Sequence, residues 1–319
     1  MHPAYSVIFF TTASGAGYGM LFLAGVLALV DRLPLSGWFS WPLFAIGLGL
    51  VSAGLLSSLL HLGHPERFLK ALTQWRSSWL SREGVLAIVG FGPAGLFALG
   101  WLFVIDDTRD IGWFMEVLAV AMIAFSAVTV YATSMIYASL KPIPQWHRRD
   151  VSLGYLTLGL ATGALLVNAL GALTATTTHL VPAIAVAALL VGALVKLSYW
   201  NALRRLAPRV TAASAIGAAT GTSVRMLDPP HTEPNFLQKE MGYRVARKHA
   251  DKLRRIALVL GFAVPLAAVL VSFATVGPWT AVLAVAAAVS GLAGIAVERW
   301  LFFAEATHTV TLYYGEAAV

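Results

Sequence analysis

The sequence contains no cysteine among its 319 residues, and only 12% of the residues are charged. Without cysteine there is no disulfide, no iron–sulfur cluster held by thiolates of this chain and no catalytic thiol. A soluble domain carries about 25% charged residues, so the low charge argues against an ordinary soluble protein. If the protein handles electrons, a partner or a bound cofactor must therefore carry them.

Apolar residues dominate, at 58% of the chain, and the mean hydropathy is +0.76. Runs of about 18 or more apolar residues recur, each long enough to cross about 30 Å of hydrocarbon. They are continuous, unlike the alternating strands of a β-barrel. No basic segment precedes the first run, so we expect a retained span and not a cleaved signal peptide. We predict an all-α polytopic membrane protein, a single integral membrane domain over 1–319, with eight transmembrane helices at 5–30, 40–62, 84–105, 113–139, 152–172, 179–201, 255–276 and 279–303.

Basic residues gather in three connecting segments, 63–83, 140–151 and 202–254. The opposite face has only Arg32 and Arg109 between its spans. Lys and Arg favour the cytoplasmic side, so we expect these segments to be cytoplasmic, in a bacterial inner membrane. Both termini would then be cytoplasmic too, since the span count is even. The long basic loop 202–254 is a candidate docking surface for a soluble partner; the alternative is contact with anionic lipid alone.

The most polar stretch between two spans reads HLGHPERFLKALTQWRSSWLSRE, from His61 to Glu83. His61 and His64 follow the second span, and Glu83 begins the third, on one face of the membrane. A quinone gains or loses two protons with two electrons. Neutral histidine can hydrogen-bond a quinone carbonyl, a carboxylate can exchange protons, and Tyr137 could add a phenol hydrogen bond. The plain alternative is that Glu83 stabilises a helix start through the helix dipole and His61 satisfies a loop.

The last span ends in ERWLFFAEATH, which holds Glu298, Glu305 and His308 at helical spacing. Such spacing places them near one helix face, where they would form a proton path if they faced the bundle. Facing outward they would be snorkelled interface residues, which is the interpretation we favour. A bis-histidine haem needs two histidines facing each other from different spans, and His61 with His308 is a geometrically possible pair. Because both are predicted at helix ends, we expect no haem and no metal bound by this chain.

Several motifs carry a resemblance to a known family. They are HLGxP at 61–65, WRSSWLSRE at 75–83, Tyr137 with PxPxW at 142–146, and the terminal ERWLFFAEATH. Over essentially the whole chain they resemble the membrane anchor subunit of dimethyl sulfoxide reductase and its relatives. The resemblance implies a three-subunit complex with a molybdopterin catalytic subunit and an iron–sulfur subunit with four clusters. The anchor would be haem-free and hold the quinone site, with roles for His61 and Glu83 at the matching positions.

One branch of that family faces the cytoplasm and oxidises sulfite while reducing quinone. The N-terminal HPAYSVIFFTTASGAGYGML and the predicted orientation are similar to that branch. We therefore expect a non-catalytic subunit that passes electrons to ubiquinone or menaquinone, with sulfite oxidation favoured over the quinol-oxidising anchor of a dimethyl sulfoxide reductase. A transporter is the alternative of another class. It would show charged or broken helices near mid-membrane and internal repeats, whereas the ionisable residues here cluster at one face.

Overall fold

A computed structural model describes residues 5–59, 64, 68–103, 112–176, 178–207, 210–219, 221–228, 233 and 248–319. His61, and most of the 202–254 loop beyond residue 228, lie outside these ranges. Within the described ranges the secondary structure is helical, apart from one isolated antiparallel bridge between Thr211 and Ala318. The predicted all-α class is confirmed.

Eight helical segments are long and apolar enough to cross a membrane, as predicted. They are α1 (Tyr5–Leu29), α2 (Gly37–Leu59), α4 (Trp79–Phe103), α5 (Gly112–Ala138), α6 (Arg149–Leu173), α7 (Leu180–Arg204), a continuous segment made of α11 (Ala250–Leu258), the π-helix η2 (Val259–Ala263) and α12 (Val264–Ser272), and α13 (Pro278–Ala304). Three short helices complete the described chain: α3 (Phe68–Leu72), α8 (Ala212–Ala215) and the 3₁₀ helix η3 (Thr309–Tyr314).

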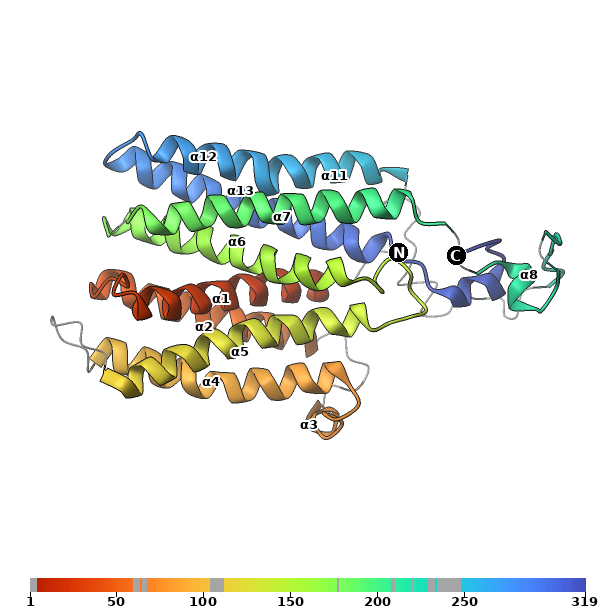
Figure 1. Cartoon of the computed structure of the whole chain (residues 1–319), viewed down its shortest axis with the longest axis horizontal. Helices are drawn as coiled ribbons and strands as arrows, with labels where there is room; N and C mark the ends of the chain where they lie inside the picture. Colours follow the sequence, from red (N-terminus) through yellow and green to blue (C-terminus); the bar gives the residue numbers. More distant parts are fainter. Residues whose placement is uncertain are drawn as a thin grey trace.

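The spans form one bundle in which α1 and α6 are the most enclosed (Figure 1). In their most apolar stretches 72% and 67% of the residues are buried, against 28–39% in the other spans. Large apolar side chains on the outer spans stay exposed, as expected where lipid replaces water. Examples are Ile88, Leu96, Leu99, Val117, Val120, Val191 and Leu194.

Glycines let α1 and α6 approach closely. A Cβ added to Gly19 would lie 2.1 Å from the carbonyl oxygen of Gly159, and one added to Gly163 would lie 2.3 Å from the carbonyl carbon of Gly19. No larger residue fits at these positions without moving a backbone. Small residues at helix crossings are the usual way in which spans pack in lipid. This contact fixes α6 against the centre of the bundle.

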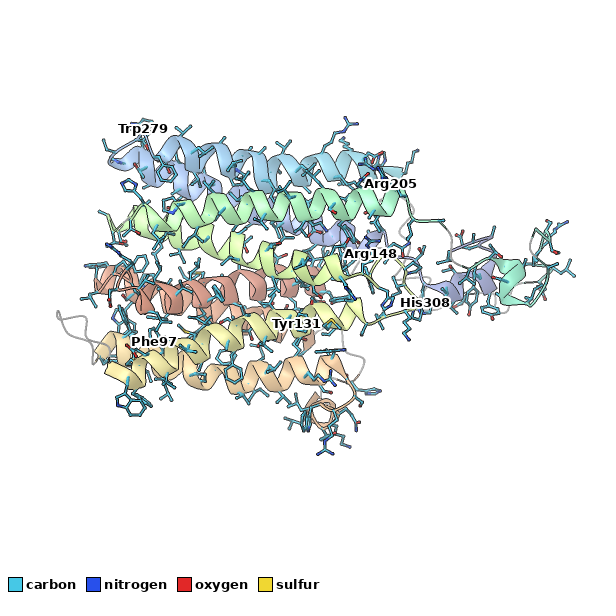
Figure 2. The ribbon with its side chains drawn as sticks, in the orientation of Figure 1. Phe97, Tyr131, Arg148, Arg205, Trp279 and His308 are labelled. Atoms are coloured by element: carbon cyan, nitrogen blue, oxygen red, sulfur yellow. The ribbon has the colours of Figure 1, made fainter. Side chains whose placement is uncertain are left out.

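The start of α1 and the end of α13 lie at the same end of the bundle, together with α3 (Figure 1). Arg148, Arg205 and His308 mark this end, whereas Phe97 and Trp279 lie toward the other (Figure 2). We call it the basic end, because the three basic segments begin or end there. The third span extends further in this direction than predicted, since α4 begins at Trp79 and not at 84.

Beyond the basic end, the start of the long loop pairs with the C-terminal segment. Val210 and Val319 exchange two backbone hydrogen bonds of 3.2 and 2.9 Å, and the Ala212 amide donates to the Ala317 carbonyl at 2.9 Å. Thr211 caps α8 through a capping box with Ser214. The pairing places α8 beside η3, beyond the helix ends (Figure 1). We call residues 210–219 together with 309–319 the terminal plate.

Candidate functional site

Glu83 lies inside the bundle and not at a helix start. It is the fifth residue of α4 and is only 4% exposed. The Thr133 hydroxyl of α5 donates a hydrogen bond to its carboxylate. Among the described residues, no cation contributes to the electrostatics of this carboxylate. The interpretation of Glu83 as a dipole-stabilising residue of the first turn does not fit this buried position.

The loop before α4 explains how Glu83 is directed inward. The Ser78 hydroxyl accepts a hydrogen bond from the Ser81 amide at 3.4 Å, which starts the helix. Arg82 folds back toward the surface: it donates to the carbonyls of Trp75 and Arg76 at 2.9 and 2.7 Å. With Arg82 anchored on the loop, the next residue along the helix points into the bundle, since successive residues lie about 100° apart.

A strip of hydroxyl groups extends from Glu83 toward the middle of the bundle. Thr133 and Thr129 are one turn apart on α5, and Tyr18 of α1 lies near both Thr129 and Glu83. Tyr18 and Thr129 are 7% and 0% exposed, and their hydroxyls lie close to each other, although this contact falls short of good hydrogen-bond geometry within the described structure. Together with Thr133 and Glu83 they form a buried polar strip, Tyr18–Thr129–Thr133–Glu83, which offers hydrogen-bonding groups inside the bundle.

Tyr137 lies in an aromatic cluster at the basic end. Its ring packs against Trp146 and Phe303 with ring centroids 5.1 and 5.2 Å apart, and it stacks on Tyr155 at 5.9 Å. The Trp146 indole donates to the Phe302 carbonyl at 3.0 Å, which fixes the cluster to α13. Tyr137 also lies close enough to Glu83 to interact with it electrostatically. Tyr137 and its neighbour Tyr155 are therefore near both Glu83 and the charged groups of α13.

Those charged groups, Glu298 and Arg299, form a buried triad with Lys196 of α7. The Lys196 Nζ lies 2.5 Å from a Glu298 carboxylate oxygen, and the Arg299 Nε lies 3.6 Å from the other oxygen. The Arg299 guanidinium carbon is 3.8 Å from the centre of the Tyr155 ring, a cation–π contact. All three charged residues are at most 4% exposed.

The triad corrects the expectation for the last span. Glu298 faces the bundle, so the favoured interpretation of a snorkelled interface residue is wrong. The predicted common helix face also fails, because α13 ends at Ala304 and His308 lies in extended backbone beyond it. Sequence reasoning assigned no role to Lys196. The sequence did hold an indication of its role. Lys196 and Glu298 are opposite charges inside two different spans of a chain with few charges, and such residues usually pair.

Glu305 follows α13 and forms a separate ion pair, with Arg254 of α11 at 2.6 Å. Partial burial raises the pKa of Glu305 above its ordinary value, and the attraction of Arg254 opposes that rise. His308 accepts a hydrogen bond from the Val310 amide at 3.0 Å, and burial lowers the pKa of His308. The three residues of the predicted path are thus near the basic end but in different surroundings.

The predicted histidines are placed only in part. His61 lies outside the described residues, and His64 is exposed. Within the described part of the chain, no three His, Asp or Glu side chains gather as metal ligands do. The structure therefore brings together Glu83 and Tyr137 of the predicted residues, and adds Thr133, Thr129 and Tyr18, which hydropathy could not single out.

The chain is similar in sequence to one known family and to two characterised proteins. Residues 1–315 match the family described as DMSO reductase anchor subunit (DmsC). The chain is 34% identical to a sulfite dehydrogenase subunit of Allochromatium vinosum, over the whole of both proteins. It is 26% identical to a component of the anaerobic dimethyl sulfoxide reductase of Escherichia coli over 170 residues, which cover 52% of this chain and 58% of that one.

Proposed function

The chain belongs to the DMSO reductase anchor subunit family, and we propose that it binds quinone beside Glu83 and passes electrons to it from an iron–sulfur partner. The match to a sulfite dehydrogenase subunit is longer and closer than the match to a dimethyl sulfoxide reductase component. Sulfite oxidation with quinone reduction is therefore the activity we assign to the complex. Membership of an anchor family also favours this function over the transporter alternative.

The observation that carries the proposal is the polar strip with Glu83 at its outer end. A buried carboxylate that is bonded by Thr133 alone among the described residues, and that lies near the hydroxyls of Tyr18 and Thr129, suits a substrate that brings polar oxygens and takes up protons. Ionisable groups inside spans are costly and are kept where they serve function. Quinone reduction needs two electrons and two protons, and Glu83 is the group we assign to proton delivery.

The other predicted residues take supporting roles in this proposal. His61, which lies outside the described residues, is assigned a hydrogen bond to a quinone carbonyl on the strength of the resemblance. His64 and Tyr137 are assigned to the rim of the same site; Tyr137 interacts electrostatically with Glu83.

We assign proton entry to the basic end, which in this proposal faces the cytoplasm of the bacterial inner membrane with both termini. Glu305 lies at this end, and Glu298 is held deeper by Lys196. His308 joins Glu305 as the outermost titratable group of the path, and Glu298 is assigned a structural role outside it because Lys196 and Arg299 hold it as an ion pair. The Glu305–Arg254 pair is the part of the path most open to exchange, because its side chains are 12% and 15% exposed whereas that of Glu298 is fully buried.

The terminal plate and the basic 202–254 loop are the docking surface we assign to the iron–sulfur subunit. Ile216 and Tyr313 of the plate are 62% and 58% exposed, and Leu227 just beyond it is 94% exposed. Clusters of exposed apolar side chains are typical of protein interfaces. The partner would carry four clusters and link the anchor to a molybdopterin catalytic subunit.

The test is Glu83→Gln in the whole complex. We expect the complex to assemble and to reduce a soluble dye with sulfite at the normal rate, because the catalytic subunit is untouched. Quinone-linked turnover should fall by about 100-fold or more, the usual effect of removing a proton-transferring group. Steady-state rates with quinone and with dye, measured on one preparation, give both numbers.

The matched control is Glu116→Gln, which removes an exposed carboxylate at the other end of α5. It should leave both rates unchanged. Normal quinone-linked turnover in Glu83→Gln would disprove the site. If the complex turns over with dimethyl sulfoxide and quinol but not with sulfite, the quinol-oxidising alternative is correct and sulfite oxidation is not.

A further inference from the structure

An apolar groove of about 130 Å³ lies in the middle of the spans, between α1, α5 and α6. Its lining is apolar, except for Ser126 and the hydroxyl of Tyr18. The lining residues are Gly15, Tyr18, Gly19, Phe22, Ser126, Ala127, Val130, Leu156, Gly159 and Leu160. The close contact of α1 and α6 at their glycines forms one side of it. Phe22, Ala127, Leu156 and Leu160 are only half-buried, so the groove reaches the lipid-facing surface.

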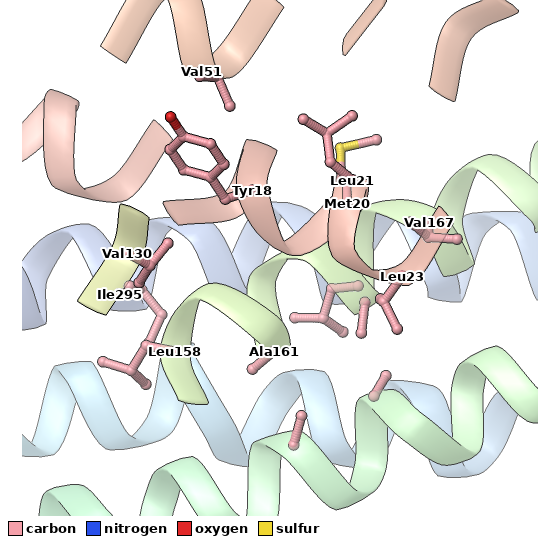
Figure 3. Close-up of a cluster of buried hydrophobic side chains, with 14 of the residues drawn as sticks. Tyr18, Met20, Leu21, Leu23, Val51, Val130, Leu158, Ala161, Val167 and Ile295 are labelled. Atoms are coloured by element: carbon pink, nitrogen blue, oxygen red, sulfur yellow. The ribbon is translucent and has the colours of Figure 1, made fainter. Parts of the chain in front are cut away.

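Tyr18 joins this groove to the polar strip. Its ring lines the groove, and Figure 3 shows it beside Val130, another lining residue, with the hydroxyl pointing away from Val130 and Leu158. That hydroxyl lies near Thr129 and Glu83. Thr129 and Val130 are neighbours on α5, so the polar and the apolar walls are adjacent. A molecule with a polar head and a hydrocarbon tail would fit both walls at once.

The size of the groove suits a section of chain and not a whole lipid. A dry apolar cavity on the order of 150 Å³ takes up a molecule as large as benzene. The groove is similar in volume and opens toward lipid, where the rest of a long chain would lie. Its depth is also suitable: Ser126 and Tyr18 are near the middle of their spans, whereas Glu83 is one turn from the start of α4.

We infer that this groove binds the first part of the isoprenoid tail of the quinone, with the head group at the polar strip. The inference rests on the proposed function, since it names the route by which that substrate enters from the bilayer. Tyr18 is then a positioning residue, which divides the head-group space from the tail space. Specificity for long-tailed quinones would come from α1, α5 and α6 and not from the loop that holds His61.

The test compares two quinones with the same head group, one with a long isoprenoid tail and one without a tail. Ala127→Phe places a ring in the groove. In the whole complex it should raise the KM for the long-tailed quinone by roughly tenfold, because about two methylene-sized groups lose their buried contacts. The kinetic constants for the tailless quinone should stay within about a factor of two.

Ala124→Phe is the matched control, because Ala124 is exposed on α5 one turn before Val128, outside the groove. It adds the same ring to the lipid-facing side, and it should leave the kinetic constants for both quinones unchanged. An equal loss with both quinones in Ala127→Phe, or no loss with either, would overturn the tail assignment. These outcomes differ from failure of the proposed function, which is a normal rate for both quinones in Glu83→Gln.

A second measurement does not depend on turnover. A quinone that carries a photoreactive diazirine on the first isoprene unit should label peptides from α1, α5 or α6 of the wild-type complex, and the label should fall in Ala127→Phe. Labelling confined to other helices would overturn the inference. So would labelling of the groove by a diazirine phospholipid that excess long-tailed quinone does not displace, since the occupant would then be an acyl chain.

Discussion

Two buried carboxylates near the basic end of the bundle have opposite electrostatic surroundings. Glu298 on α13 lies 2.5 Å from Lys196 and has Arg299 as a second cation nearby. Glu83 on α4 is as deeply buried but has only the Thr133 hydroxyl as a partner among the described residues. One carboxylate is neutralised by the fold, and the other is left open to a proton or a ligand.

The difference has an energetic basis. A buried ion pair needs both members, because a lone charge in a low-dielectric interior costs several kcal/mol. Glu298 is therefore fixed as an anion by its neighbours and is poorly suited to give up or take up protons during turnover. Glu83 has no such constraint from the described chain, so its protonation can follow the chemistry beside it. In the proposed function Glu298 is therefore a structural acid, and Glu83 is the acid to which we assign proton transfer.

The largest expected effect is on stability, from Glu298→Gln. This change leaves Lys196 buried without its anion and should lower the free energy of unfolding by about 3–5 kcal/mol. Thermal unfolding of the purified complex in detergent, followed by tryptophan fluorescence, measures the loss. Retention of the wild-type midpoint would show that the pair is not structural.

Replacing the whole triad tests whether its charges or its volume matter. The triple variant Lys196→Met, Glu298→Met and Arg299→Met removes all three buried charges and keeps long apolar side chains in their place. Such replacements are often neutral or stabilising, so most of the lost stability should return. A triple variant as unstable as the single one would assign the effect to packing and not to charge.

A smaller effect is expected from Thr133→Val, which removes the partner of Glu83 and keeps the shape of the side chain. Loss of a hydrogen bond to a charged or proton-sharing group is worth about 1.5–3 kcal/mol, so quinone-linked turnover should fall on the order of tenfold. The rate with a soluble dye should not change. Stopped-flow or steady-state assays with both acceptors separate the two.

Thr162→Val is the matched control for that change. Thr162 is equally buried, on α6, and its hydroxyl donates to its own helix at Leu158 over 2.8 Å. It should leave turnover unaltered. Equal effects of the two threonine variants would mean that the Thr133 bond serves helix packing, and the contrast between Glu83 and Glu298 would lose its support.

The fold was predictable from the sequence because a span is a property of length and hydropathy. Eight apolar runs predicted eight spans, and the structure has them. The ends were less accurate. The helix α4 begins five residues before the predicted start, because Trp79, Ser81 and Arg82 are polar or amphipathic and can extend a helix through the interfacial region. This shift moved Glu83 from a helix end to a buried position.

The site was less predictable because it depends on how the spans rotate against one another. Hydropathy does not determine which side of α7 meets α13, so the pair of Lys196 with Glu298 could not be located. The predicted common face of Glu298, Glu305 and His308 required the last helix to continue to His308. The helix ends at Ala304, and no Pro or Gly in the sequence marks that end. Tyr18 and Thr129 belong to the polar strip only through the contact of α1 with α5.

The smallest expected effect concerns Glu305, which has a cationic partner but lies outside the spans. Burial raises its pKa although Arg254 opposes the rise. The folded pKa thus lies above the unfolded value, so the folded chain holds this proton more tightly. The contribution of Glu305 to stability grows as pH falls through the folded pKa and is complete below the unfolded one. When the pH is lowered from about 7 to about 4.5, the thermal unfolding midpoint of Glu305→Gln should therefore rise less, or fall more, than that of the wild type.

Arg254→Met tests the cause of that difference, because it removes the attraction that favours the Glu305 anion. The folded pKa of Glu305 should rise further, so over the same pH range the midpoint of Arg254→Met should rise more, or fall less, than that of the wild type. The two variants thus deviate from the wild type in opposite directions. If the thermal midpoints of all three proteins change with pH in the same way, Glu305 does not titrate in this range. It would then be a charge held by its partner, as Glu298 is.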